Sequence, residues 1–138
     1  MIAGIGVDIV RIGRIEAALN RFGERFARRV LAPPEWADFE ASARPASFLA
    51  KRFAAKEAMG KAIGTGVRDP VTLHGMWLVR GPLGKPSFVF SAAARALLER
   101  HGVTRHHLSL SDEDDAAVAM VVLESVDQPG TKIGRAHV

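Results

Sequence analysis

The chain has 138 residues, of which 48% are hydrophobic and 25% are charged, as in an ordinary globular protein with a substantial core. It contains no cysteine, which excludes a disulfide framework and any metal site built on thiolates. No apolar run is long enough to cross a membrane and the N-terminus does not resemble a signal peptide, so we expect one cytoplasmic domain over residues 1–125. The net charge of +4 equals the excess of six arginines over two glutamates within residues 11–29.

Residues 1–10 are predicted to form a short buried strand, because most of them are apolar and several are β-branched. Gly4 and Gly6 would weaken a strand unless another backbone or a ligand has to approach closely there. Asp8 places a carboxylate in a run that should be buried, which is costly unless the group is paired or binds a metal. Equally, Asp8 could cap a helix that begins near Arg11 or pair with an arginine.

Residues 11–30 are predicted to form a helix, because apolar residues recur there at helical spacing, with Gly23 as a possible break. Most of its arginines would then face solvent. A run of charges is usually only a solvated helix face, but this one would also attract an acidic partner. Nucleic acid is a poor candidate, since the basic residues have no interleaved aromatics and the sequence has neither a zinc pattern nor a nucleic-acid module.

The longest predicted helix covers about 46–63, a segment rich in alanine and free of proline. The glycines of the segment 64–66 would end it. Before it, we expect a short helix from Pro33 to Phe39 and a polar linker over 42–45.

Glu57 and Lys61 share one face of the long helix, and Phe53 lies on the same stripe one turn before Glu57. A carboxylate and an ammonium beside an apolar stripe would lie at the edge of a core, where a metal or a phosphate could be held. An ordinary surface ion pair explains the same spacing, and from this helix alone we favour that interpretation by roughly three to one.

The second half of the chain is predicted to contain four strands and one helix. The predicted strands are 71–80, 85–90, 106–111 and 116–124. Turns at 81–84 and at the acidic segment 112–115 would join them in pairs, and Ser91 would cap a helix over 92–101. The histidines are isolated or adjacent on a strand, and the acidic turn lacks calcium-loop spacing, so neither set indicates a metal site.

The residues after Glu124 continue none of these patterns, so we expect a disordered tail over 126–138. Its last six residues, 133–138, read as the translation of a common sequencing adapter. We therefore hypothesise that this tail is not native.

Two longer motifs, with three short ones, resemble a known family. The N-terminal strand reads Gly-Ile-Gly-Val-Asp-Ile-Val over 4–10, and the long helix reads Arg-Phe-Ala-Ala-Lys-Glu-Ala-Met-Gly-Lys-Ala-Ile-Gly-Thr-Gly over 52–66. The shorter motifs are Gly-Lys-Pro at 84–86, Leu-Ser-Leu-Ser at 108–111 and Ala-Ala-Val-Ala at 116–119. In this order and spacing they resemble the holo-acyl-carrier-protein synthases, a 4′-phosphopantetheinyl transferase family, over nearly the whole chain.

This resemblance implies an α+β fold in which a small antiparallel sheet packs around one long helix, and a homotrimer with active sites between subunits. The implied activity transfers the 4′-phosphopantetheine group of coenzyme A to a serine of apo-acyl carrier protein. The products are holo-acyl carrier protein and 3′,5′-ADP, and the pathway served is fatty acid biosynthesis. For this reaction we expect Asp8 and Glu57 to bind Mg²⁺. Glu57, or a metal-bound water that it orients, would take the serine proton, and Lys61 would neutralise or protonate the leaving phosphate.

The resemblance also implies where the two substrates bind. Acyl carrier protein, which is acidic, would dock on the first helix through Arg14, Arg21 and Arg25. The positions expected to contact coenzyme A are Arg52, Lys56, Gly64, Thr65, Gly66, Lys85, Pro86 and Ser111. Many relatives carry histidine where this chain has Asp112, so any role of an imidazole at that position is in doubt here.

Two other function classes fit the same residues. Another Mg²⁺-dependent phosphodiester enzyme, such as a nucleotide pyrophosphatase, would use Asp8 and Glu57 but needs no basic docking helix. A non-enzymatic basic binding module would tolerate the loss of both carboxylates.

Overall fold

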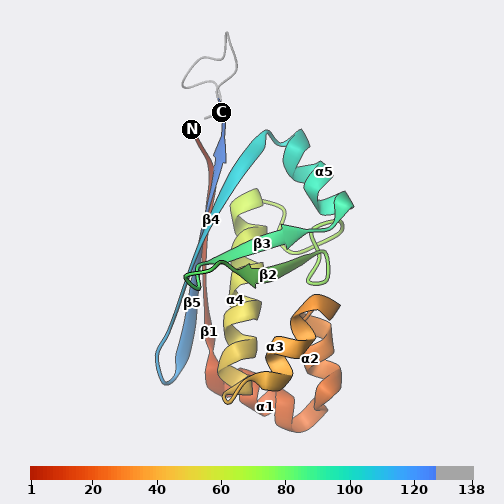
Figure 1. The fold of residues 1–138 in the computed structure, drawn as a ribbon, viewed down its shortest axis with the longest axis vertical. Coiled ribbons are helices and arrows are strands. Elements are labelled where there is room, and N and C mark those ends of the chain that lie inside the picture. Colours follow the sequence, from red (N-terminus) through yellow and green to blue (C-terminus); the bar gives the residue numbers. More distant parts are fainter. Residues whose placement is uncertain (127–138) are drawn as a thin grey trace.

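A computed structural model describes residues 1–126, and most of the tail expected at 126–138 lies outside the described residues. The described chain contains five helices, a short 3₁₀ turn and five strands (Figure 1). In chain order these elements are β1 (Ile2–Arg11), α1 (Ile12–Phe22), α2 (Glu24–Val30), the 3₁₀ turn η1 (Pro33–Glu35), α3 (Trp36–Ala41), α4 (Pro45–Ile63), β2 (Met76–Arg80), β3 (Pro86–Phe90), α5 (Ala92–Arg100), β4 (Val103–Asp112) and β5 (Ala116–Ser125). Within this range, no helix is both long and apolar enough to span a bilayer.

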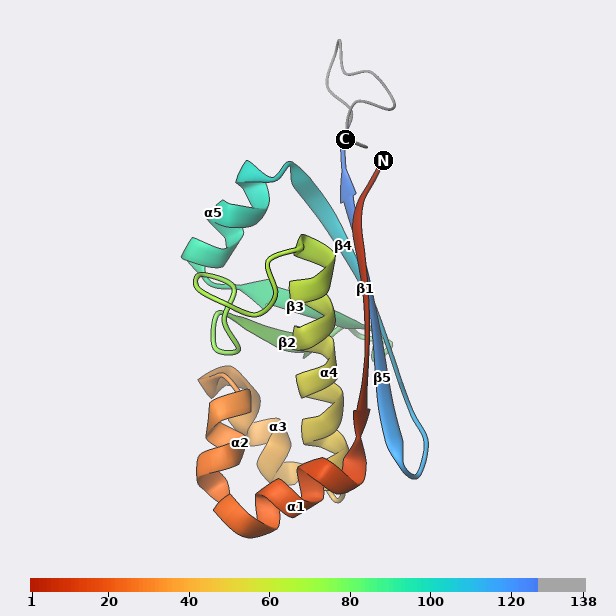
Figure 2. The same cartoon turned by 180° about the vertical axis from the view of Figure 1, so that it is seen from behind.

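Strands β1, β5 and β4 form an antiparallel sheet in that order, and the long helix α4 packs against one face of it. Viewed from behind, β1 runs beside α4, while α1 and α2 extend away from its first turns (Figure 2). Strands β2 and β3 form a separate antiparallel hairpin. The predicted α+β class and the helix-centred sheet are therefore confirmed.

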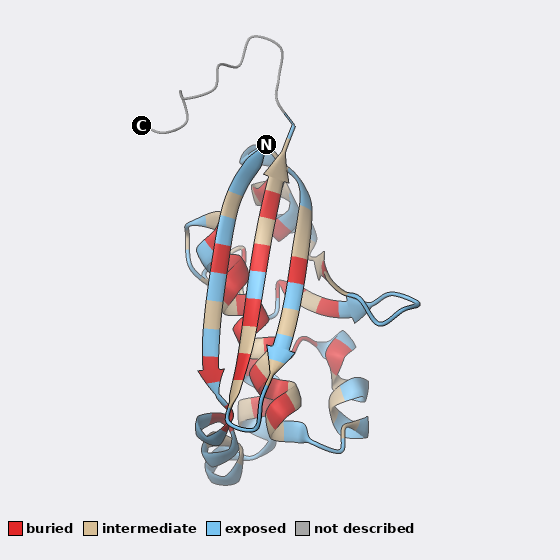
Figure 3. Ribbon diagram, turned by 90° about the vertical axis from the view of Figure 1, so that its left-hand side faces the viewer, coloured by how far each residue is buried: buried red, intermediate tan, exposed pale blue. Residues whose placement is uncertain are grey.

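The two faces of the sheet differ in what they contact. Alternate residues of β5 are buried against α4, namely Ala117, Ala119, Val121 and Leu123. On β1 the large aliphatic side chains are the exposed ones. Ile5, Val7 and Ile9 lie on the open face of the sheet, and Ile5 is 65% exposed. Figure 3 shows this open face, on which more exposed and less exposed positions alternate along most of β1 and β5. The prediction that this strand is buried is therefore wrong within one chain for Ile5, Val7 and Ile9, whereas Val10 is buried.

The glycines of β1 face α4 and allow it to approach closely. A Cβ atom on Gly4 would lie 2.0 Å from the carbonyl oxygen of Ala62, and one on Gly6 would lie 2.1 Å from that of Ala58. No side chain fits at such distances, so the close approach expected from the two glycines is confirmed. This contact determines how near Asp8, two residues after Gly6, comes to the helix.

Helix α4 begins and ends at the residues that local chemistry favours. Pro45 occupies its first turn, where a missing N–H costs no hydrogen bond, and Gly64 ends it in the left-handed region at φ 96°. The predicted break at Gly23 is also confirmed, since this residue has φ 64° and separates α1 from α2. The Ser91 hydroxyl accepts a hydrogen bond of 3.2 Å from the N–H of Ala94 and caps α5 as predicted.

Two strand boundaries differ from the prediction. Strand β2 begins at Met76 instead of residue 71. Residues 71–75 form a loop whose Leu73 carbonyl oxygen accepts a hydrogen bond from Lys56 of α4, with a single bridge between Arg68 and Val71. Strand β4 begins at Val103, so it is longer than predicted and pairs with β5 along the full length of that strand.

Candidate active site

Asp8 and Lys61 come from different elements and meet at one edge of the sheet. The Lys61 ammonium donates hydrogen bonds of 3.0 Å to the Asp8 carboxylate and 3.0 Å to the carbonyl oxygen of Val7. Among the described residues, the ion-pair partner of Lys61 is therefore Asp8 and not Glu57. Within residues 1–126, neither alternative considered for Asp8 applies, since it neither caps α1 nor pairs with an arginine.

Glu57 lies in the same pocket as Asp8, one helical turn before Lys61. Burial and then the negative charge of Asp8 raise the pKa of Glu57 above its ordinary value, although the Lys61 ammonium acts in the opposite direction. A carboxylate whose pKa is raised by a neighbouring carboxylate is suited to sharing a cation with it. The structure thus brings together all three residues predicted for catalysis and metal binding.

This donor set fits Mg²⁺, which binds proteins through one or two carboxylates and completes its shell with water and substrate phosphate. It does not fit a fully protein-enclosed cation, since residues 1–126 contain no group of three or more histidine, aspartate and glutamate side chains arranged to hold one. The pocket has a volume of about 390 Å³, and Phe53 and Phe26 form part of its apolar wall.

The same pocket is bordered by the basic side of α1. Arg11 and Arg14 line it together with Ala18. Arg21 follows Arg14 by seven residues and thus lies on the same face of the helix. Arg25 belongs to α2, beyond the break at Gly23. An anionic partner bound on this face would therefore reach the two carboxylates from the side of α1.

Arg52 and Lys56 have a different setting from the one predicted, because both are buried and bonded within the protein. The Lys56 ammonium is fully buried and donates to Glu35 at 2.7 Å and to the carbonyl oxygens of Val30 and Leu73 at 2.8 and 2.7 Å. Arg52 donates to the other oxygen of Glu35 at 2.8 Å. Because Lys56 is fully buried with three donors used, and Arg52 is only 4% exposed, neither cation is placed to bind the phosphates of coenzyme A in this chain.

Sequence reasoning missed Glu35, the residue that joins these two cations. Its carboxylate is fully buried and also accepts from the N–H groups of Ala32 and Leu78, at 2.9 and 3.0 Å. Burial alone would raise the pKa of Glu35, but the charge and hydrogen bond of Lys56, with the bonds from Leu78 and Arg52, hold it below its ordinary value. The sequence signal for Glu35 is a carboxylate that follows two prolines in an otherwise apolar segment. Local sequence pattern does not reveal that its partner, Arg52, lies 17 residues further along the chain.

The glycine segment after α4 also differs from the expectation. The N–H groups of Gly64 and Gly66 both donate to the carbonyl oxygen of Gly60, each at 3.0 Å. They close the end of the helix and are not available to a phosphate. The Thr65 hydroxyl donates to the carbonyl oxygen of Gly66 at 2.8 Å.

Lys85, Pro86 and Ser111 lie away from this pocket within one chain. Ser111 is on β4 and pairs with Val118 of β5, which in turn pairs with Ile9 of β1, so two strand spacings of about 4.8 Å separate it from β1. Lys85 and Pro86 border a cavity of about 580 Å³ under the β2–β3 hairpin. One chain therefore does not bring all the predicted substrate contacts into one pocket.

Asp112 faces the first turns of α4. Its carboxylate accepts a hydrogen bond of 3.0 Å from the Ser47 hydroxyl and lies 3.7 Å from the Lys51 ammonium. These contacts attach the end of β4 to the start of α4. The position thus has a structural use in this chain.

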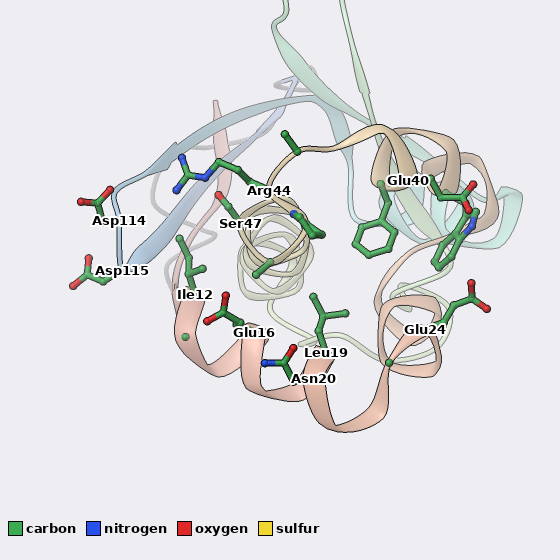
Figure 4. Close-up of a pocket in the computed structure, with 17 residues that line it drawn as sticks. Ile12, Glu16, Leu19, Asn20, Glu24, Glu40, Arg44, Ser47, Asp114 and Asp115 are labelled. Carbon is green, nitrogen blue, oxygen red and sulfur yellow. The ribbon is translucent and has the colours of Figure 1, made fainter.

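A second hollow of about 880 Å³ lies on the opposite side of α1 from Arg14, between that helix, α3 and the β4–β5 turn. Figure 4 shows acidic side chains around it from several elements, with Leu19 in its wall. The acidic residues are Glu16, Glu24, Glu40, Asp114 and Asp115. Helix α1 thus separates a basic side, next to the carboxylate pair, from an acidic side.

Comparison with known proteins identifies similar chains. A family model described as the 4′-phosphopantetheinyl transferase superfamily matches residues 4–121. A protein of Nitrosospira multiformis named holo-[acyl-carrier-protein] synthase is 52% identical over 124 residues, which cover 90% of this chain and 99% of that protein.

Solved structures agree with these sequence matches. The crystal structure of holo-[acyl-carrier-protein] synthase from Neisseria meningitidis is similar with a TM-score of 0.88 and 46% identity, and the match covers 91% of this chain and all of the other. A synthase from Bacillus anthracis, in complex with CoA (3′,5′-ADP), is similar with a TM-score of 0.75 and 37% identity, covering 91% of this chain and 99% of that one.

Proposed function

The chain belongs to the 4′-phosphopantetheinyl transferase superfamily, among its holo-[acyl-carrier-protein] synthases, and we propose that Asp8, Glu57 and Lys61 perform the transfer. The reaction moves the 4′-phosphopantetheine group of coenzyme A to a serine of apo-acyl carrier protein and releases 3′,5′-ADP. The observation that carries this proposal is a pocket, beside the basic side of α1, that is lined by two carboxylates, one of which is bonded to the Lys61 ammonium.

The chemistry is a displacement at the β-phosphorus of the pyrophosphate. A bond forms between the serine oxygen and phosphorus while the bond from phosphorus to the 3′,5′-ADP oxygen breaks. Glu57 takes the serine proton, a role that suits a carboxylate whose pKa is raised by burial and by Asp8. Lys61 lies one turn further along α4 and stabilises the negative charge that develops on the leaving phosphate.

Asp8 and Glu57 would hold Mg²⁺ between them. When bound, this cation neutralises pyrophosphate oxygens that neither carboxylate could approach without repulsion. Lys61 at present donates to Asp8, so it is held at the site by the same carboxylate that would bind the metal.

Coenzyme A as co-substrate is supported by the solved relatives, since the structures from Bacillus anthracis and Helicobacter pylori are described as complexes with it. A nucleotide pyrophosphatase would use the same carboxylates, but it has no carrier protein to bind and so does not explain why Arg11 and Arg14 lie beside them. We place the reaction in the cytoplasm and in fatty acid biosynthesis, where acyl carrier protein is used.

One assay tests this function against its alternatives. The protein is incubated with coenzyme A, Mg²⁺ and apo-acyl carrier protein, and the carrier is analysed by intact-mass spectrometry. We expect the carrier to gain the mass of one phosphopantetheine group. Hydrolysis of coenzyme A without a change in carrier mass would instead support the pyrophosphatase, and no reaction would support a binding module.

Charge reversal on the basic side of α1 should weaken binding of the carrier protein. In the Arg14→Glu, Arg21→Glu double variant, we expect the KM for carrier protein to rise by about tenfold, because complementary charges steer association. The KM for coenzyme A should hardly change, and inhibition by salt should become weaker. Steady-state kinetics at several ionic strengths would measure the two KM values and the inhibition by salt.

A matched control reverses two arginines elsewhere. Arg95→Glu with Arg100→Glu, on α5, changes the net charge equally and should leave the carrier-protein KM near that of the wild type. If both double variants behave alike, overall charge and not this docking surface governs association.

The open face of the sheet supports a homotrimer with shared active sites. Val7 and Met120 are cross-strand neighbours on this face and are 48% and 47% exposed. A second copy packed there would remove their apolar surface from water. It would also lie next to Ser111 of β4, which one chain alone keeps apart from Asp8.

Assembly should therefore depend on Val7. We expect Val7→Lys to sediment as a monomer at micromolar concentration and to lose transfer activity. Phe22→Lys, which alters an exposed apolar residue of α1, should sediment like the wild type. A monomeric wild-type protein with full activity would contradict the shared site.

A further inference from the structure

The buried ion network of Glu35, Arg52 and Lys56 has no part in the proposed chemistry. It joins two cations and one carboxylate in the interior, where all their buried side-chain nitrogen and oxygen atoms have hydrogen-bond partners. Ion networks of this kind are costly to desolvate, and apolar replacements are often no less stable. A gain in stability is therefore a weak explanation for its presence, so we considered what else it determines.

Helix α4 meets β1, the strand that carries Asp8, mainly through small apolar residues. Consecutive positions of a helix are about 100° apart, yet Ala54, Ala55 and Lys56 are all fully buried, so protein surrounds most of this helix. Leu49 and Met59 are fully buried large apolar side chains, but the side of the helix that meets β1 presents the small residues Ala58 and Ala62. Small, smooth side chains pack closely but oppose rotation about the helix axis only weakly.

The ion network supplies directional bonds where these contacts do not. Lys56 attaches α4 to the end of α2 through Val30 and to the loop before β2 through Leu73. Arg52, one turn earlier, donates to the Leu78 carbonyl oxygen at 3.1 Å, and Glu35 accepts from both cations. Bonds in several directions from two successive turns hold both the rotation and the axial position of the helix.

Glu57 directly follows Lys56, so rotation of the helix moves it. With Cα atoms about 2.3 Å from the helix axis, a rotation of about 20° displaces Glu57 by about 0.8 Å. Misplacement of a reacting group by about 1 Å lowers rates by about 100-fold. We propose that Glu35, through its bonds to Lys56 and Arg52, is a positioning residue that fixes the rotation of α4 and so aims Glu57 at Asp8.

The consequence for turnover rests on the proposed function, whereas the rotation itself does not. We therefore test them separately with Lys56→Met, which keeps most of the side-chain volume but removes three hydrogen bonds. After superposition on β1, β4 and β5, its crystal structure should show the Cα atom of Glu57 moved by about 0.8 Å or more from the wild-type position. Its kcat should fall by about 10-fold to 100-fold.

Leu98→Ala is the matched control, because it destabilises the fold from α5, far from the network. At a temperature where both variants are folded, it should keep Glu57 in place and retain the wild-type kcat. A Lys56→Met structure with Glu57 unmoved, or a kcat no lower than that of Leu98→Ala, would overturn the proposal.

If Lys56→Met does not fold, Glu35→Gln takes its place, since the amide keeps one acceptor but cannot accept from both cations. The same displacement and the same loss of kcat are expected. Asp8→Ala is measured in parallel. If Asp8→Ala remains active, the proposed site fails, while the measured rotation of α4 still decides the positioning role.

Discussion

Glu57→Gln should abolish transfer while leaving the protein folded. The amide keeps the volume of the side chain and one oxygen, but it removes the charge and the basicity that the proposed site requires. Asp8→Ala should have the same effect through loss of the second carboxylate. For each variant we expect turnover to fall by about 10³-fold or more, measured by the carrier-protein mass assay at saturating coenzyme A.

Although Glu57→Gln should abolish transfer, it should make the metal-free protein slightly more stable. The folded-state pKa of Glu57 is raised by burial and by Asp8, so ionising it as the pH rises disfavours the folded state. At neutral pH and without metal, the uncharged glutamine should therefore raise the melting temperature slightly. A fall in melting temperature would show that Glu57 makes a favourable contact that the proposed site does not include.

The control for this pair is Glu16→Gln. It removes a carboxylate from the acidic side of α1 and leaves the pocket around Asp8 intact. Its turnover should stay near that of the wild type. If Glu16→Gln were as inactive as Glu57→Gln, the assignment of the catalytic pocket would be wrong.

Gly6→Ala should be strongly destabilising for a change of a single methyl group. Its Cβ would lie 2.1 Å from the Ala58 carbonyl oxygen and 2.8 Å from the Ala62 nitrogen, both of them backbone atoms that cannot rotate away. Strand and helix would have to separate, which should cost about 3 kcal/mol or more. We expect the melting temperature, measured by calorimetry, to fall by about 10 °C or more.

Gly13→Ala is the matched substitution on α1. A Cβ at that position would meet nothing within 4 Å, and alanine is favoured over glycine inside a helix, so stability should rise by about 0.5–1 kcal/mol. Equal effects at the two glycines would mean that close approach of α4 does not explain Gly6. Any folded Gly6→Ala protein should also lose activity, because the separation moves Glu57 away from Asp8.

The sequence by itself determined much of the fold and the centre of the proposed site. Helix and strand positions followed from local chemistry, as at Gly23, Ser91 and Gly64, where caps and positive φ angles depend only on nearby residues. Gly4 and Gly6 indicated a close backbone approach, since a missing Cβ has few other uses in a strand. The family motifs then singled out Asp8 and Glu57 as candidates.

Only the tertiary structure decided which charged residues meet. Sequence spacing paired Lys61 with Glu57, but the strand packed against α4 brings Asp8 to it instead. Lys56 and Arg52 were expected to bind phosphate, yet Glu35, far away along the chain, holds both in the interior. Local spacing describes one helix at a time, whereas the partner of a charge depends on contacts between elements distant in sequence.

The orientation of β1 was also decided in three dimensions. A run of β-branched residues reads as buried from composition alone, but the side that carries the glycines is the only one that α4 can approach so closely. Ile5, Val7 and Ile9 are consequently turned to the open face, because side chains alternate along a strand. Close packing of a helix backbone against a strand thus outweighed the burial of three aliphatic side chains within one chain.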